Sequence, residues 1–481
     1  MAKTTSNFLW KFGQLCGTQI VTLLVSIIFV RVLSPNDFGR VALVAVFINI
    51  LQVFVDSGLG SALIQKKDAD DLDFSSVFYF NFFVCILLYA LMFFSAPLIA
   101  RFYKDDSLTS IVRVISLLIV LSGIKGIQQA YVSRKMIFRK FFFATLGGTV
   151  FSAILGIYLA YSGYGVWALV IQQLSHNFID TLILWLTVKW RPKLIFSWIR
   201  LKGLLSYGWK LLASSLLDVV YGNLSNLIIG KKYSPSDLAF YKQGNDIPVI
   251  STYVSSSVNS VFFPEMANAQ DDRERVKELT RQSILLSTYF MAPILMVILF
   301  SAEPIVRLIL TEKWIPCVPY LRIFCIVYLI HPFSAVNLTV IKAVGRSDLA
   351  LKLEILKKVV GLVALCGAMW FGVKAIACVV LFNMIFCQIM DSLVSYKFTK
   401  YSGFKQVKDA LPGIILAVFS GFVASLIGLL SLSDIYTFIL EILLALSLYI
   451  GLSMLFHLRA YEYFKAELRL LISNKNVDSM L

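Results

Sequence analysis

The segment K-W-R-P-K-L-I-F-S-W-I-R-L-K-G-L-L-S-Y-G-W-K, from Lys189 to Lys210, separates two halves of the chain that resemble each other. It is rich in Lys and Arg and contains no acidic residue. A predicted helix in this segment has Lys193, Ser197 and Arg200 on one side, and its apolar residues lie on the other side: Leu194, Ile195, Trp198, Leu201 and Leu205. This pattern is typical of a helix that lies in a membrane interface.

The composition indicates a polytopic membrane protein. Hydrophobic residues make up 58% and charged residues 15% of the 481 residues, and the mean hydropathy is +0.79. An ordinary soluble chain is about half apolar and roughly a quarter charged. The net charge of +16 does not indicate nucleic acid as a partner, because the basic residues are spread between apolar blocks. The seven cysteines form no C-x-x-C pair, so we expect neither a disulfide framework nor a metal site.

Apolar runs of about 20 residues predict an all-α protein with about fourteen transmembrane helices. The first run is too long for the apolar region of a cleavable signal, so we expect it to stay as the first helix. Most Lys and Arg residues fall in the connections that lie inside if both termini are cytoplasmic. The predicted helices cover residues 12–33, 41–64, 76–100, 108–130, 142–162, 165–188, 206–230, 247–267, 281–302, 318–341, 353–371, 374–396, 410–430 and 434–457.

Three sequence motifs recur in the same order in the two halves. RVLSPNDFG at 31–39 recurs as KKYSPSDLA at 231–239, SAPLIAR at 95–101 as SAEPIVR at 301–307, and GVWA at 165–168 as GVKA at 372–375. Six helices per copy is an even number, so the copies start on the same side and a pseudo-twofold axis along the membrane normal relates them. We therefore predict a six-helix lobe at 1–188, an amphipathic cytoplasmic linker at 189–205, a second six-helix lobe at 206–400, and two additional helices and a cytoplasmic tail at 401–481.

Polar side chains follow one face of four predicted helices, the first, second, seventh and eighth. A lipid-facing surface cannot hold such groups cheaply, so the stripes predict a hydrophilic cavity at the symmetry axis. The alternative is that small and hydroxyl residues only let the helices pack closely, although Asp56 and Asp218 do not suit that role. The predicted cavity residues are Gln14, Thr18, Thr22, Gln52, Asp56, Lys125, Lys210, Asp218, Asn226 and Ser256.

Several ionisable residues inside the predicted helices allow two interpretations. His176 and Asp180 in the sixth helix either satisfy each other as buried hydrogen-bonding groups or bind a proton or cation. Lys125 either neutralises an anionic ligand or extends to the interface, which its position favours. Lys210 contacts either a phosphate of a ligand or a lipid headgroup. The candidates for ion coupling by a proton or sodium are Asp56, His176, Asp180, Asp218 and Asp391.

Motifs of catalysis are missing from the sequence. The three histidines fall in separate predicted helices, and no G-x-S-x-G or Walker motif occurs. The connections are too short to hold a catalytic domain. The sequence therefore predicts a transporter without a cofactor and not an enzyme.

Four segments carry a resemblance to a known family: WKFGQ at 10–14, RVLSPNDFGRVAL at 31–43, FVDSGLGSALIQ at 54–65 and APLIARFY at 96–103. They resemble the polysaccharide-exporter branch of the multidrug/oligosaccharidyl-lipid/polysaccharide flippase superfamily, and in particular lipid-linked oligosaccharide flippases of the colanic-acid-exporter type. The resemblance implies two lobes arranged as a V, with the same four helices lining the cavity. It places Asp56 in a matching motif, whereas the several cavity arginines of related lipid flippases have few counterparts here.

The resemblance also implies a substrate and a location. The substrate would be an undecaprenyl-pyrophosphate-linked oligosaccharide, flipped across the bacterial inner membrane for exopolysaccharide, capsule or O-antigen assembly. We expect membrane lipids, a polysaccharide polymerase and chain-length proteins as further partners. The mechanism we expect is ion-coupled alternating access. The alternatives are a multidrug/cation antiporter of the same fold, a membrane glycosyltransferase or polymerase, and a scaffold of an assembly complex.

Overall fold

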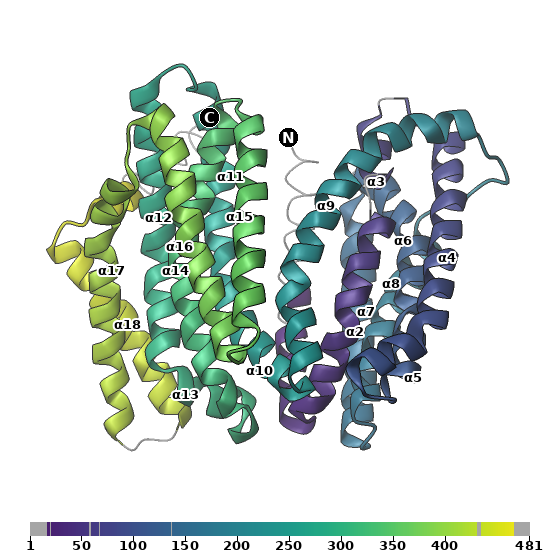
Figure 1. The fold of residues 1–481 in the computed structure, drawn as a ribbon, viewed down its shortest axis with the longest axis horizontal. Helices are drawn as coiled ribbons and strands as arrows, with labels where there is room; N and C mark the ends of the chain where they lie inside the picture. Colours follow the sequence, from purple (N-terminus) through teal and green to yellow (C-terminus); the bar gives the residue numbers. More distant parts are fainter. Residues whose placement is uncertain are drawn as a thin grey trace, which may run out of the picture. The chain divides into compact units, whose positions relative to one another are not determined.

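The computed structural model describes residues 17–19, 21–56, 59–66, 68–135, 137–430 and 434–465, and these residues form helices and no strands (Figure 1). The prediction of an all-α polytopic membrane protein is confirmed. The chain divides into two compact units, Met1–Ala239 and Phe240–Leu481.

The first unit begins with an apolar helix at Gly17–Val32. The helices that follow are α2 (Pro35–Asp56), α3 (Leu59–Gln65), α4 (Asp71–Tyr103), α5 (Leu108–Ile115), α6 (Leu117–Arg134), α7 (Phe138–Tyr161), α8 (Val166–Thr187) and α9 (Trp198–Lys232). Helix α10 (Pro235–Asp246) contains the boundary between the two units.

The second unit contains the remaining helices. The long ones are α11 (Thr252–Asn268), α12 (Arg273–Phe300), α14 (Val318–Ala343), α15 (Ser347–Ala368), α16 (Val373–Thr399), α17 (Gly403–Ser425) and α18 (Asp434–Leu455). The short ones are η1 (Pro248–Ser251), α13 (Ala302–Ile305), η2 (Val306–Leu310), η3 (Glu312–Cys317) and η4 (Leu426–Leu430).

A helix passes through each of the fourteen predicted ranges. Among the described residues, 10 helices are long and apolar enough to cross a membrane. The other four fall short for visible reasons. The helix Gly17–Val32 and α11, which has 17 residues, are too short; α8 carries the polar patch around His176, and α15 carries charged residues in its first half. Apolar length therefore finds most of these helices, and polar residues mark the rest.

The first part of the basic segment is not helical, although the sequence predicts a helix that begins within it. Residues 188–197 form no helix, and α9 begins only at Trp198. Pro192 lacks an N–H group and disfavours helical backbone at the residue before it. The backbone N–H groups of Lys193 and Ser197 instead donate to the hydroxyls of Ser75 and Ser76 on α4, at 3.0 and 2.9 Å. The prediction of a helix is therefore wrong for residues 193–197, where side chains from α4 take up backbone N–H groups, and it holds from Trp198 onward.

Helix α9 runs without a break from the end of the basic segment through the predicted seventh span. It contacts α2, α3 and α4, all within the first unit. An aromatic cluster anchors the segment that leads into it, since Trp190 lies 5.7 Å from Phe74 and 6.0 Å from Tyr131 between ring centroids. The division of the chain into compact units thus falls after α9, whereas the lobe boundaries at the basic segment stay a prediction.

The first repeated motif has the same geometry in both copies. Ser34 donates its hydroxyl to Asp37 Oδ2 at 2.6 Å, and the Asp37 N–H donates to Ser34 Oγ at 3.3 Å. Ser234 and Asp237 make the same two bonds at 2.7 and 3.1 Å. Each pair caps the first turn of a helix that begins with proline, α2 in one copy and α10 in the other.

The two copies of this motif also touch each other inside the first unit. A Cβ atom added to Gly39 would lie 1.9 Å from the carbonyl oxygen of Pro235. Only glycine lets the two backbones approach so closely. The second copy has Ala239 at the matching position.

Candidate functional site

Helix α9 exposes a polar face. Ser214, Asp218 and Gly222 follow one another at intervals of four residues, and all three are exposed. A carboxylate on the surface of a membrane helix is costly against lipid, so such a face normally borders water or protein. The sequence predicts this stripe, and in the structure its residues at 214, 218 and 222 are exposed.

Helix α11 carries a similar row of hydroxyls. Ser256 and Ser260 are exposed on it. Ser255 is fully buried, and its Oγ has no hydrogen-bond partner among the described residues. Two of these serines are therefore exposed, whereas Ser255, next to Ser256 in the chain, is buried.

The remaining predicted cavity residues are only partly described. Thr18 is half-buried with an unpartnered Oγ1 within the described ranges, and Thr22 is exposed. Gln52 is half-buried, as is Asn226, which donates to Asn223 Oδ1 at 3.5 Å. Gln14 and the side chains of Asp56 and Lys210 lie outside the described part of the chain. A cavity lined by these residues stays a prediction.

The first unit buries an ion pair between two of the predicted residues. Lys125 Nζ on α6 lies 3.2 Å from Asp180 Oδ2 on α8, and it donates to Asn177 Oδ1 at 3.0 Å. The side chains are 14% and 3% exposed. His176, one turn before Asp180, is close enough to interact electrostatically with both charges. Lys125 is therefore engaged with α8, a partner that neither interpretation of the sequence included.

The second unit buries its own pair, and its lysine was missing from the predicted site. Lys357 Nζ on α15 lies 3.2 Å from both carboxylate oxygens of Asp391 on α16 and 2.9 Å from Glu354 Oε1. Ser334 on α14 donates to Asp391 Oδ2 at 2.5 Å. Asp391 is fully buried. The signal in the sequence was a lysine three residues after a glutamate at the edge of an apolar run.

The two pairs are similar without being symmetric. Asp180 and Asp391 lie on the sixth and twelfth predicted helices, which the repeat relates. Their lysines come from the fourth helix in one unit and the eleventh in the other, which the repeat does not relate. Burying either charge alone is expensive, so each pair needs both members. No group of three metal-ligating side chains occurs in the described ranges.

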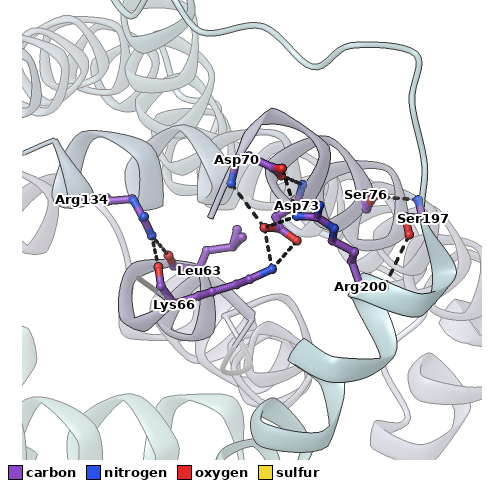
Figure 2. A network of polar contacts seen from close by, with 8 residues as sticks. All are labelled: Leu63, Lys66, Asp70, Asp73, Ser76, Arg134, Ser197 and Arg200. Carbon is purple, nitrogen blue, oxygen red and sulfur yellow. Dashed lines mark hydrogen bonds and ion pairs between the residues drawn. The ribbon is translucent and has the colours of Figure 1, made fainter. Parts of the chain in front are cut away.

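A network of charges ties four elements of the first unit together where α3 ends and α9 begins (Figure 2). Asp73 is fully buried and accepts from Lys66 at 2.7 Å and from Arg200 at 3.4 Å. Arg134 at the end of α6 donates to the carbonyl oxygens of Leu63 and Lys66 at 2.6 and 2.5 Å. We call these residues, together with Asp70, the charge network.

Asp70 is the N-cap of α4 and the exposed edge of the charge network. It accepts from the Asp73 N–H at 3.0 Å and pairs with Arg200 at 2.9 Å. The hydrogen bond from the Asp73 N–H and, with a smaller effect, the charge of Arg200 hold the pKa of Asp70 below its ordinary value. The network thus stabilises the start of α4 and the start of α9 together.

The fold and these sites define a multi-pass membrane protein with buried ion pairs. Residues 28–319 match the model of a family described as polysaccharide biosynthesis protein, and the chain belongs to that family. The resemblance to the polysaccharide-exporter branch of the flippase superfamily is confirmed.

Three known proteins illustrate the similarity. The teichuronic acid biosynthesis protein TuaB of Bacillus subtilis is 28% identical over 311 residues, which are 62% of each chain. The succinoglycan biosynthesis transport protein ExoT of Rhizobium meliloti is 24% identical over 77% of this chain and 75% of its own. The lipid II flippase MurJ, in an inward closed conformation, has the same fold, with a TM-score of 0.74, 13% identity, and coverage of 94% of this chain and 99% of its own. These relatives agree with a transporter and not with an enzyme.

Proposed function

We propose that this protein flips undecaprenyl-pyrophosphate-linked oligosaccharide repeat units across the bacterial inner membrane. The observation that carries the proposal is the exposed polar face of α9, with Asp218 at its centre. A hydroxyl-rich headgroup can exchange its hydration for contacts with such a face. The family and the name of ExoT supply the class of cargo, a polysaccharide precursor.

The physical task is to move a charged, hydrated headgroup through hydrocarbon. Without a polar path, each unpaired hydroxyl costs several kcal/mol, on the order of 4–8, and the pyrophosphate costs far more. In the proposed mechanism the sugar and pyrophosphate pass along the polar faces while the polyprenyl chain stays in lipid. Alternating access then moves the opening from one leaflet to the other.

Ion coupling gives the cycle its direction in this proposal. Lys357 has two carboxylates within reach, Glu354 and Asp391. This cluster therefore has one negative charge more than it has lysines, and it can accept a proton or a sodium ion. Lys125 and Asp180 balance each other, and Asp218 lies on the exposed polar face of α9. Asp56 and His176 complete the set of candidates.

The surroundings of the protein follow from the same proposal. The connections rich in Lys and Arg, the charge network among them, lie in the cytoplasm together with both termini. A polymerase and chain-length proteins receive the flipped unit on the other side of the membrane. Membrane lipids and the lipid-linked oligosaccharide are the immediate partners.

The experiment that tests the function measures the sidedness of a lipid-linked oligosaccharide in proteoliposomes. Purified protein is expected to make inner-leaflet substrate accessible to an added glycosidase when a proton or sodium gradient is imposed. Asp218→Asn is expected to lower the rate at least tenfold, and Asp106→Asn, an exposed aspartate in a connection, serves as the matched control.

Three results would count against the proposal. Unchanged sidedness with folded wild-type protein would exclude flipping of this substrate. Movement of organic cations against the gradient, with no movement of the oligosaccharide, would favour the antiporter instead. Elongation of the sugar chain by pure protein would favour the polymerase.

A further inference from the structure

A cavity of about 580 Å³ lies in the second unit between α12, α17 and the turn that follows α18. Its wall consists of residues 408–416 of α17, residues 456–460 after α18, and Leu285, Thr288 and Tyr289 of α12. This volume is in the range of ligand sites in proteins. The cavity is separate from the polar face of α9 and from both buried ion pairs.

Two cations at the rim of the cavity have no partner within the described ranges. Lys408 and Arg459 are exposed, and no acidic side chain there pairs with either. Asp409 also lines the cavity, but it is already engaged by Arg281 at 2.9 Å and by the Tyr401 hydroxyl at 2.8 Å. The rim is therefore positively charged and suited to an anion.

An unsatisfied hydrogen-bonding group lies close behind the cavity wall. Tyr449 is 2% exposed, and its hydroxyl has no hydrogen-bond partner among the described residues. The hydroxyl lies 3.6 Å from the position of a Cβ on Gly413, a residue of the cavity wall. A buried hydroxyl is usually satisfied, so this side of the wall is also short of one hydrogen-bond partner.

An apolar track leads away from the cavity along α17. Its side chains recur every three or four residues and are exposed to between 39% and 55%. Exposed Phe404 and Phe456 lie at the ends of α17 and α18 that border the cavity, as aromatic residues do at membrane interfaces. The residues of the track are Leu411, Ile415, Val418, Phe419 and Phe422.

We propose that this cavity binds an anionic phospholipid, with its phosphate between Lys408 and Arg459 and its acyl chains along the track on α17. Basic pockets between transmembrane helices are known sites for such headgroups. The pocket holds the headgroup and the glycerol, and the exposed apolar stripe takes the chains that the pocket is too small to enclose.

The test measures binding to the purified full-length protein in a neutral detergent. Dioleoyl phosphatidylglycerol is expected to raise the unfolding temperature well above the effect of dioleoyl phosphatidylcholine, because a ligand that binds only the folded state stabilises it. Lys408→Gln and Arg459→Gln are each expected to weaken binding about fivefold, and the double variant about thirtyfold, as native mass spectrometry measures it.

Two further variants separate the site from general surface charge. Lys405→Gln removes an exposed lysine of α17 that does not line the cavity, and it is expected to bind the phospholipid as wild type does. Gly413→Leu keeps every charge and fills the cavity, and it is expected to abolish the preference for phosphatidylglycerol.

Four outcomes would overturn the proposal. They are equal stabilisation by the two lipids, equal losses for Lys405→Gln and Lys408→Gln, full stabilisation by inorganic phosphate alone, and displacement of the phospholipid by undecaprenyl phosphate at much lower concentration. The last would assign the cavity to the transported carrier. Because binding is measured without flipping, the proposal does not depend on the proposed function.

Discussion

Gly39 has no Cβ atom, and this allows its backbone to lie against the backbone of Pro235. A side chain there would press on the Pro235 carbonyl at 1.9 Å, and backbone cannot move aside as a flexible side chain can. We predict that Gly39→Ala destabilises the protein by at least about 1–3 kcal/mol. A lower unfolding temperature of the purified variant would show this.

The control for this prediction is Gly126→Ala in α6. No atom lies within 4 Å of the added Cβ at that position. Alanine is favoured over glycine in a helix by roughly 0.5–1 kcal/mol, so this variant should be as stable as wild type or slightly more so. Equal unfolding temperatures for the two variants would contradict the close approach at Gly39.

The pair of Lys125 and Asp180 makes a second prediction at the residue scale. Lys125→Met leaves the buried Asp180 carboxylate without its cation, which should cost about 3–5 kcal/mol. Replacing both, as Lys125→Met with Asp180→Leu, should cost clearly less than the sum of the single changes. A double-mutant cycle from unfolding curves measures the difference, and additive losses would mean that the two charges do not interact.

At the scale of elements, the start of α4 and the start of α9 depend on the same acidic residues. Asp70 has a folded pKa below its ordinary value of 3.8. Its contribution to stability is therefore complete above the unfolded pKa and is lost as the pH falls through the folded pKa. We predict that the free energy of unfolding of Asp70→Asn falls less steeply than that of wild type as the pH is lowered. Unfolding curves from neutral to acidic pH would measure this.

Asp68→Asn is the matched control for the acid profile, since Asp68 is exposed and lies outside the charge network. It should leave the profile as in wild type. If Asp70→Asn and wild type lose stability in parallel as the pH falls, the contacts of Asp70 with Asp73 and Arg200 do not stabilise the fold.

The long helices could be predicted because apolar length alone determines them. The start of α9 could not, because it depends on Ser75 and Ser76, which are more than 100 residues away in the chain and take up backbone N–H groups of the basic segment. The polar stripe with Asp218 was predictable from spacing by four. The partner of Lys125 was not, since spacing within one helix does not reveal which helix faces it.

At the scale of the whole molecule, the distribution of Lys and Arg predicts the orientation in the membrane. In a variant with the native cysteines replaced, a cysteine at Asp271 should react only after the membrane is opened, because the proposed topology places it in the cytoplasm. A cysteine at Asp106 should react with an impermeant maleimide in intact cells. Both positions are exposed. The opposite labelling pattern would mean that the protein has the opposite orientation in the membrane.

The duplication was the most far-reaching prediction from the sequence, and its first motif shows how far such a prediction extends. The Ser-Pro-x-Asp string correctly related the two copies, but the predicted helices left both strings in connections, whereas each one begins a helix, α2 or α10. It could not indicate that the two caps lie against each other, because that contact joins residues almost 200 positions apart. Hydrogen bonds between neighbouring residues can be predicted from the sequence, whereas contacts between the two copies of a motif cannot.

The contact between Gly39 and Pro235 gives the two halves of the gene unequal freedom to diverge. The second copy has Ala239 where the first has Gly39, so the two copies differ at this position. A chimera with residues 31–39 copied over residues 231–239 should fold. The reciprocal chimera would place alanine at position 39, and its methyl group would clash with the Pro235 backbone. Position 39 therefore tolerates no side chain, whereas position 239 has alanine.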